Sequence, residues 1–80
     1  MSTPDAAAHL TYNGELYNFR ELRTALEDSG IQFRTRSDTE VLLRHGERHW
    51  AQGLSSLNGM FAFALWDQTR GRLLLARDRV

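Results

Sequence analysis

The sequence predicts an α+β fold in which antiparallel strands pack against two helices. Apolar residues recur at the 3.6-residue spacing of a helix along Phe19 to Ser29, and a second helical segment follows from Thr39 to about Trp50. Between Met60 and Arg77, two apolar segments flank a turn, which is the pattern of a β-hairpin. Both patterns in one short chain indicate a single small domain.

Composition narrows the classes of function. The 80 residues carry ten basic and ten acidic side chains, so no net basic charge favours nucleic acid or an anionic membrane. There is no cysteine, which excludes disulfides, thiolate metal sites and a cysteine nucleophile within these residues. The first residues lack the pattern of a signal peptide, and no apolar run has membrane-spanning length. We therefore expect a cytoplasmic protein.

The chain begins with residues 1–8, which show no periodicity and are expected to form a loose leader. The predicted domain covers residues 9–80. His9 to Tyr12 is expected to be a short edge strand. It should end at Asn13-Gly14, because this pair is typical of turns.

The first predicted helix runs from Phe19 to Ser29. Asn18 is expected to cap it, its side-chain oxygen accepting from an exposed backbone N–H, and Gly30 stands just past its end. Apolar and polar residues then alternate from Ile31 to Arg36, which predicts a half-buried strand.

The second predicted helix starts after Ser37 or Asp38, either of which could cap it. Glu40 would lie in its first turn, where the helix dipole favours a carboxylate. His45 and His49 share the i, i+4 spacing of a ligand pair. No glutamate completes the His-Glu-x-x-His pattern, so we expect no metal site.

The C-terminal part predicts a short turn over residues 54–57 and then the hairpin. Both strands of the hairpin carry apolar residues on both faces, as strands in the middle of a layered structure do. Two helices can cover one face, but the other needs a second sheet, which 80 residues hardly supply. We therefore expect the chain to dimerise by packing sheet on sheet, to aggregate or to remain poorly folded. The face that needs cover is expected to be that of Phe61, Phe63 and Leu65, which alternate with Met60, Ala62, Ala64 and Trp66.

Asn13 and Gly14 also form the first candidate site. Asn13 offers a side-chain NH₂ and Gly14 a bare backbone N–H, and two such donors could hold a developing oxyanion. Glu15 follows them, and Asp38 places another carboxylate at a predicted loop tip. Each feature has a plainer interpretation. The six residues from Asn13 to Asn18 could form an ordinary strand-turn-helix corner, and Asp38 could be a helix cap worth about 1 kcal/mol.

Four blocks of sequence give these residues a context. In order and content they resemble the glutaminase domain of asparagine synthetase, a class II glutamine amidotransferase of the N-terminal-nucleophile hydrolase type. Related amidotransferases that make glucosamine phosphate do not usually carry the third block, which points to the asparagine-synthetase branch. The blocks are Asn13-Gly14-Glu15-Leu16-Tyr17-Asn18-Phe19-Arg20-Glu21-Leu22, Arg36-Ser37-Asp38-Thr39-Glu40-Val41-Leu42-Leu43, Leu57-Asn58-Gly59-Met60-Phe61-Ala62-Phe63-Ala64-Leu65-Trp66-Asp67 and Leu75-Ala76-Arg77-Asp78-Arg79.

The resemblance implies a four-layer αββα sandwich, of which this chain would be a partial slice. It implies that Asn13 and Gly14 form an oxyanion hole, and that Asn13, Gly14, Glu15 and Asp38 bind glutamine. In this family an N-terminal cysteine attacks the side-chain amide of glutamine, with its own α-amino group as base. The released ammonia amidates aspartate in a synthetase domain that uses ATP and magnesium. No cofactor or metal is expected within these 80 residues.

Three features of the family do not occur here: the cysteine, the carboxylate-binding arginine that precedes the Asn-Gly block, and the ATP-binding motif. The sequence therefore predicts an internal fragment of the domain. Whether the chain is itself an enzyme stays open, and its glutamine binding would be weak or lost. Ser2 could act as an N-terminal nucleophile after loss of Met1. The alternative is a catalytically dead remnant or interaction module that binds a partner or itself through the uncovered sheet. It would act as a homodimer or with a complementary segment.

Overall fold

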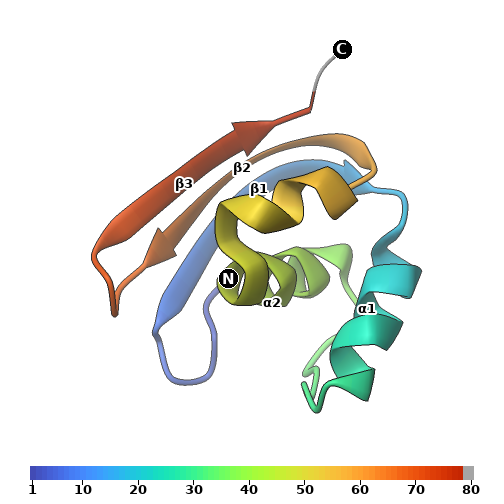
Figure 1. The fold of residues 1–80 in the computed structure, drawn as a ribbon, viewed down its shortest axis with the longest axis horizontal. Coiled ribbons are helices and arrows are strands. Elements are labelled where there is room, and N and C mark those ends of the chain that lie inside the picture. The colour runs from blue at the N-terminus through green and yellow to red at the C-terminus, as the bar shows by residue number, and fades with distance from the viewer. Residues whose placement is uncertain (79–80) are drawn as a thin grey trace.

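The computed structural model describes residues 1–78. Its three antiparallel strands form one curved sheet in the order β1-β2-β3, and all the helices lie on one side of it (Figure 1). This arrangement confirms the α+β fold class. Arg79 of the fourth sequence block lies outside the described residues. The elements are β1 (Ala8–Leu16), α1 (Phe19–Asp28), α2 (Asp38–His49), the 3-10 helix η1 (Trp50–Ser56), β2 (Gly59–Asp67) and β3 (Arg72–Arg77).

The core lies between the sheet and α2. Ala8 pairs with Asp67 and Leu16 with Gly59, so β1 and β2 run side by side over nine residues without a bulge. Side chains therefore alternate strictly between the two faces of the sheet. The face toward the helices is buried, and α2 contributes three consecutive apolar residues to it. The buried apolar side chains are Ala8, Leu10, Leu16, Leu26, Val41, Leu42, Leu43, Phe63 and Leu65.

The expected turn at Asn13-Gly14 is wrong, because β1 continues through both residues to Leu16. Gly14 has a φ of +132°, and a Cβ there would lie 2.1 Å from the Met60 carbonyl oxygen. The glycine therefore allows close approach of two paired strands rather than a reversal of the chain. Local turn propensity yields here to nine residues of strand pairing.

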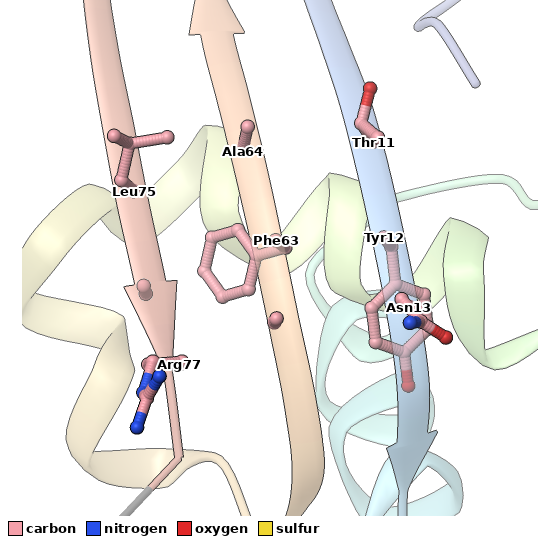
Figure 2. Close-up of a pocket in the computed structure, with 9 residues that line it drawn as sticks. Thr11, Tyr12, Asn13, Phe63, Ala64, Leu75 and Arg77 are labelled. Carbon is pink, nitrogen blue, oxygen red and sulfur yellow. The ribbon is translucent and has the colours of Figure 1, made fainter.

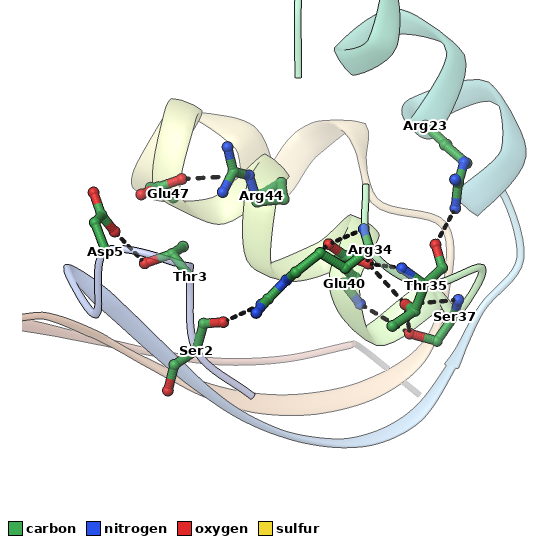
Figure 3. A network of polar contacts seen from close by, with 10 residues as sticks. All are labelled: Ser2, Thr3, Asp5, Arg23, Arg34, Thr35, Ser37, Glu40, Arg44 and Glu47. Carbon is green, nitrogen blue, oxygen red and sulfur yellow. Dashed lines mark hydrogen bonds and ion pairs between the residues drawn. The ribbon is translucent and has the colours of Figure 1, made fainter. Parts of the chain in front are cut away.

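The expected strand from Ile31 to Arg36 is also wrong. These residues form an extended loop whose backbone donors bind a side chain instead of another strand. The Glu40 carboxylate accepts from the backbone N–H groups of Arg34 and Thr35 and from the Thr35 hydroxyl, as Figure 3 shows. The alternating pattern was nevertheless informative, since Ile31 and Phe33 pack against the core.

The helix termini differ in part from expectation. Ser37 caps α2, its hydroxyl accepting from the Glu40 N–H at 3.3 Å. Asn18 precedes α1 but makes no side-chain capping bond. Its amide instead donates to the Ser56 carbonyl at 2.7 Å and accepts from the Asn58 N–H at 3.0 Å. Asn18 thus joins the start of α1 to the segment between η1 and β2. The expected turn at 54–57 belongs mostly to η1.

Residues 1–8 were expected to form a loose leader, but Ala8 is the first residue of β1 and the residues before it contact the sheet. Met1 pairs with Leu10 through two hydrogen bonds, in which the Met1 α-amino group donates to the Leu10 carbonyl and the Leu10 N–H donates to the Met1 carbonyl. Thr3 is buried, and its hydroxyl accepts from the Ala8 N–H. This segment covers the first part of the free edge of β1.

The face of the sheet away from the helices is not covered by any of the 78 described residues. Figure 2 looks onto this face, with the helices behind the strands. The apolar pattern on both faces of the hairpin is confirmed, but the uncovered side is not the one expected, because Phe63 and Leu65 point into the helical core. The exposed large apolar side chains on the open face are Met60 (57% exposed), Trp66 (37%), Leu73 (54%) and Leu75 (70%).

Candidate functional site

The candidate site lies along the free edge of β1. Phe61, which is opposite Gly14, directs its N–H to the Asp78 carboxylate and accepts from the Asp78 N–H, both at 3.0 Å. Both its backbone groups therefore point toward β3, and Gly14–Phe61 is a non-hydrogen-bonded pair of the β1–β2 ladder. The Gly14 N–H consequently points away from β2, toward an edge at which residues 1–78 place no further strand.

Two other residues of β1 support this direction. Leu10 and Leu16 share the alternation of Gly14, and their N–H groups bind Met1 and Asp38, outside the β1–β2 ladder. No such partner contacts the Gly14 N–H among residues 1–78. Gly14 therefore offers a free backbone donor in the middle of this edge.

Asn13 and Glu15 alternate with Gly14, and both side chains lie exposed on the open face. Asn13 lies opposite Ala62, which is opposite Arg77 on β3, so the three residues form one row across the sheet. A shallow pocket of about 280 Å³ includes Asn13, Gly14 and Arg77. The side-chain amide of Asn13 makes no hydrogen bond within residues 1–78, so it is available to a ligand at the residue next to Gly14.

Asp38 comes to the same edge from the first turn of α2. Its Oδ2 accepts from the Leu16 N–H at 3.1 Å and from the Tyr12 hydroxyl at 2.9 Å. Tyr12 and Leu16 flank Gly14 on β1. Three of the four residues named from the sequence therefore lie on β1 between Tyr12 and Leu16, and the fourth, Asp38, is hydrogen-bonded to both of these flanking residues. Asn13 and Glu15 approach it from the open face, and Asp38 approaches from the helical side.

Sequence reasoning missed Tyr12. Its position on the alternation of Leu10 and Leu16 was the available signal, because it places the ring on the helical face beneath the Asn-Gly pair. Burial raises the pKa of Tyr12 above its ordinary value of 10.0, and the hydrogen bond to Asp38 and the charges of Asp38 and Glu15 raise it further. The phenol therefore stays protonated at neutral pH and can donate its hydrogen bond to Asp38.

Ser2 occupies a different part of the edge. Its hydroxyl lies 2.6 Å from Nδ1 of His9, its partner in an isolated β-bridge. His9 and Asn13 are four residues apart on an extended strand, about 13 Å at 3.3 Å per residue. The Ser2 hydroxyl therefore does not lie beside the donors of Asn13 and Gly14.

The histidines of α2 have a structural role. Nε2 of His45 is 2.9 Å from the Gly53 carbonyl oxygen, so the ring links η1 to α2. The ring centroids of His45 and His49 are 4.7 Å apart. Burial lowers the pKa of His45. Within residues 1–78, no three histidine or carboxylate side chains are placed to hold a metal ion. No helix in that part of the chain is long and apolar enough to cross a membrane.

Comparison with known sequences gives one consistent result. The sequence profile of the glutamine amidotransferase domain matches residues 1–80. The chain is 51% identical over 72 residues to glutamine-hydrolysing asparagine synthetase 3 of Bacillus subtilis, and 44% identical over 78 residues to synthetase 1 of that organism. These matches cover 89% and 98% of this chain but only 12% of each relative. The chain thus spans about an eighth of the curated relatives it matches.

Two solved structures share the fold. Glutamine phosphoribosylpyrophosphate amidotransferase from B. subtilis superimposes with a TM-score of 0.72 at 31% identity, over 98% of this chain and 19% of that one. An allosteric regulatory enzyme of purine biosynthesis superimposes with a TM-score of 0.70 at 34% identity, over 89% of this chain and 17% of that one.

Proposed function

This chain belongs to the glutamine amidotransferase domain family, and we propose that it forms the glutamine-holding edge of a glutaminase domain of the asparagine-synthetase type. The single observation that carries the proposal is the convergence of Asn13, the free Gly14 N–H and Asp38 on one edge of β1. These groups match the two ends of glutamine, a side-chain amide and an α-ammonium.

The Asn13 amide and the Gly14 N–H form the oxyanion hole in this proposal. When a nucleophile attacks the side-chain amide of glutamine, negative charge develops on the carbonyl oxygen. Two fixed donors that meet this oxygen stabilise the tetrahedral intermediate more than the substrate. Both donors belong to one strand paired over nine residues, so little reorganisation is needed as the charge develops.

Asp38 binds the α-ammonium of glutamine. Its Oδ2 is held by Tyr12 and Leu16, and its Oδ1 has no hydrogen-bond partner among residues 1–78. A carboxylate oxygen that is free at a strand edge suits a charge-assisted bond to an ammonium group. Glu15, exposed two residues beyond Asn13, adds negative charge on the open face and contributes to holding the same end of the substrate.

The nucleophile would come from outside these 80 residues, because they contain no cysteine. The α-carboxylate of glutamine likewise needs a cation that the convergent residues do not supply. In the longer protein, released ammonia would amidate aspartate in a domain that uses ATP and magnesium. We expect no ammonia release from glutamine by the purified chain above a heat-treated control.

The proposal predicts weak, ammonium-dependent binding. We expect the chain to bind L-glutamine in the millimolar range, since losing a charge-assisted contact to the carboxylate costs about 1.5–3 kcal/mol. Glutaramate, which is glutamine without its α-amino group, should bind more weakly still. Asp38→Asn should abolish this preference while keeping the size of the side chain. NMR titration to about tenfold above the dissociation constant measures all four affinities.

Three results would oppose the proposal: no saturable binding of glutamine, equal affinity for both ligands in the wild type, or an Asp38→Asn variant that keeps the preference. A matched control is Asp28→Asn, at the C-terminal end of α1, which should bind like the wild type.

A second function is favoured by the open face of the sheet. Leu73 and Leu75 are more than half exposed there, and Leu73 lies opposite the exposed Trp66. Contiguous apolar surface of this kind marks a site of association. We expect the chain to self-associate at low micromolar concentration. Leu75→Glu should reduce association, because it places a charge on the open face, where two copies of the chain would pack together. Sedimentation velocity measures the difference.

The control for this variant is Gln52→Glu, which adds the same charge to an exposed residue of η1 on the helical side. A wild type that sediments as a compact monomer would exclude self-association through the open face. Equal loss of association in both variants would mean that net charge, rather than the open face, controls it.

A further inference from the structure

Tyr12 connects the sheet to the proposed ammonium site. Its side chain lies on the helical face of β1, two residues from the Gly14 donor, and packs against the core. The hydroxyl at the end of the ring reaches across to Asp38 at the first residue of α2. Tyr12 is therefore the one side chain that ties the Asn-Gly strand to the candidate carboxylate among residues 1–78.

Asp38 is not occupied as a helix cap. Ser37 performs that role through its own hydroxyl, and both hydrogen bonds of Asp38 go to β1. Because both bonds end on the same oxygen, Oδ2, they fix the carboxylate while leaving Oδ1 free. One bond, from the Leu16 N–H alone, would leave the carboxyl group free to rotate about that contact.

We propose that Tyr12 is a positioning residue, whose hydroxyl works with the Leu16 N–H to hold Asp38 so that Oδ1 faces the ammonium group of the ligand. This inference rests on the proposed function of the β1 edge. Tyr12 itself does not contact the ligand. Its effect is transmitted through the orientation of one carboxylate.

The raised pKa of Tyr12 fits this role. Burial, followed by the hydrogen bond to Asp38, raises the pKa of Tyr12 and keeps the phenol protonated at neutral pH, so the hydroxyl can donate to the carboxylate there. A phenylalanine at this position would keep the ring in the core and remove only the donor. Tyr12→Phe is therefore a variant that separates positioning from packing.

The first measurement is the side-chain conformation of Asp38 without ligand. Three-bond couplings between the Asp38 carboxyl carbon and its backbone nuclei report χ1. We expect a single rotamer in the wild type and averaging over rotamers in Tyr12→Phe. Tyr17→Phe is the matched control, because Tyr17 directly follows β1 and is 54% exposed. It should leave the couplings of Asp38 unchanged.

The second measurement is ligand affinity by the same NMR titration. Affinity for L-glutamine should fall about tenfold in Tyr12→Phe, the factor expected when a charged group loses its orienting hydrogen bond. Affinity for glutaramate, which has no ammonium group, should not change. A variant that merely loosens the fold would weaken both ligands alike.

The outcomes separate the two claims. An unchanged Asp38 rotamer in Tyr12→Phe overturns the positioning role, whatever the glutamine affinity of the wild type. A released rotamer with unchanged glutamine affinity also overturns it. If the wild type binds neither ligand, the proposed function of the edge fails and the ligand role of Tyr12 fails with it. Couplings and selectivity that change as expected support both.

Discussion

Replacement of Gly14 by alanine is expected to prevent the chain from folding. The backbone at Gly14 has a φ of +132°, which residues with a Cβ adopt only at a cost of about 1–3 kcal/mol. The new Cβ would also lie 2.1 Å from the Met60 carbonyl oxygen and 2.7 Å from the Phe61 Cα, both backbone atoms of the neighbouring strand. Relief would require β1 and β2 to separate at the Gly14–Phe61 pair, near the end of β1 that leads to α1. The combined loss approaches the whole free energy of unfolding of a small domain, which is about 5–15 kcal/mol.

Gly30→Ala is the matched control for this prediction. Gly30 also has a positive φ, +101°, but a Cβ there would meet no atom within 4 Å. Its cost should be the conformational term alone, about 1–3 kcal/mol. Thermal unfolding followed by circular dichroism distinguishes the two variants. A Gly14→Ala chain as stable as Gly30→Ala would mean that β1 does not pass this close to β2.

Replacement of Glu40 by alanine should cost nearly as much stability. Glu40 is 2% exposed, and its two oxygens accept from the Arg34 N–H, the Thr35 N–H and the Thr35 hydroxyl. Arg34 adds an ion pair at 3.9 Å. Without the carboxylate, two backbone donors of the loop before α2 lose their partners. We expect a loss of about 3–5 kcal/mol in the free energy of unfolding, measured by urea denaturation.

Glu21→Ala controls for the helix dipole, because Glu21 lies in the first turn of α1 as Glu40 lies in the first turn of α2, but is exposed. It should cost about 0.3–1 kcal/mol. Equal losses in the two variants would show that the loop donors bind elsewhere.

The Glu40 network also predicts how stability depends on pH. Burial alone would raise the pKa of Glu40, but hydrogen bonds from Arg34 and Thr35 outweigh it and hold the pKa below the ordinary 4.5. The unfolded chain therefore takes up a proton at a higher pH than the folded chain. This contribution to stability is complete above pH 4.5 and is lost as pH falls through the lower, folded pKa. In Glu40→Ala the acid-dependent loss should be smaller.

Those features of the fold that depend on periodicity could be predicted from the sequence. The first helix and the β2–β3 hairpin lie where the apolar spacing placed them, because that spacing reflects which face is buried, and the second helix begins after its predicted cap. The motif blocks identified the asparagine-synthetase resemblance, which the sequence comparisons confirm. These signals are local and survive in a short chain.

Features that depend on distant partners could not be predicted. Asn18 is a residue type typical of helix caps, but its side-chain amide forms hydrogen bonds with the backbone of Ser56 and Asn58, some forty residues away. The loop at 31–36 alternates like a strand, but the Glu40 carboxylate takes its backbone donors. At both places the sequence correctly indicated groups that form hydrogen bonds, but it did not reveal which groups they bond to.

The candidate site was predicted by residue type and completed by geometry. Asn13, Gly14, Glu15 and Asp38 followed from the motif, whereas the free direction of the Gly14 N–H follows only from the strand register. Tyr12 carried no motif signal that separated it from the core residues of its strand.

Mapping the amide shifts caused by L-glutamine tests the central claim most directly. The account predicts that the largest shifts occur at Gly14, whose N–H would bind the amide oxygen, at Asp38, and at the Asn13 side-chain NH₂. It also predicts that the shifts at Gly14 persist with glutaramate while those at Asp38 vanish. Shifts centred on the open hairpin face, around Leu73 and Leu75, or shifts that ignore Gly14, would contradict a glutamine site at the edge of β1.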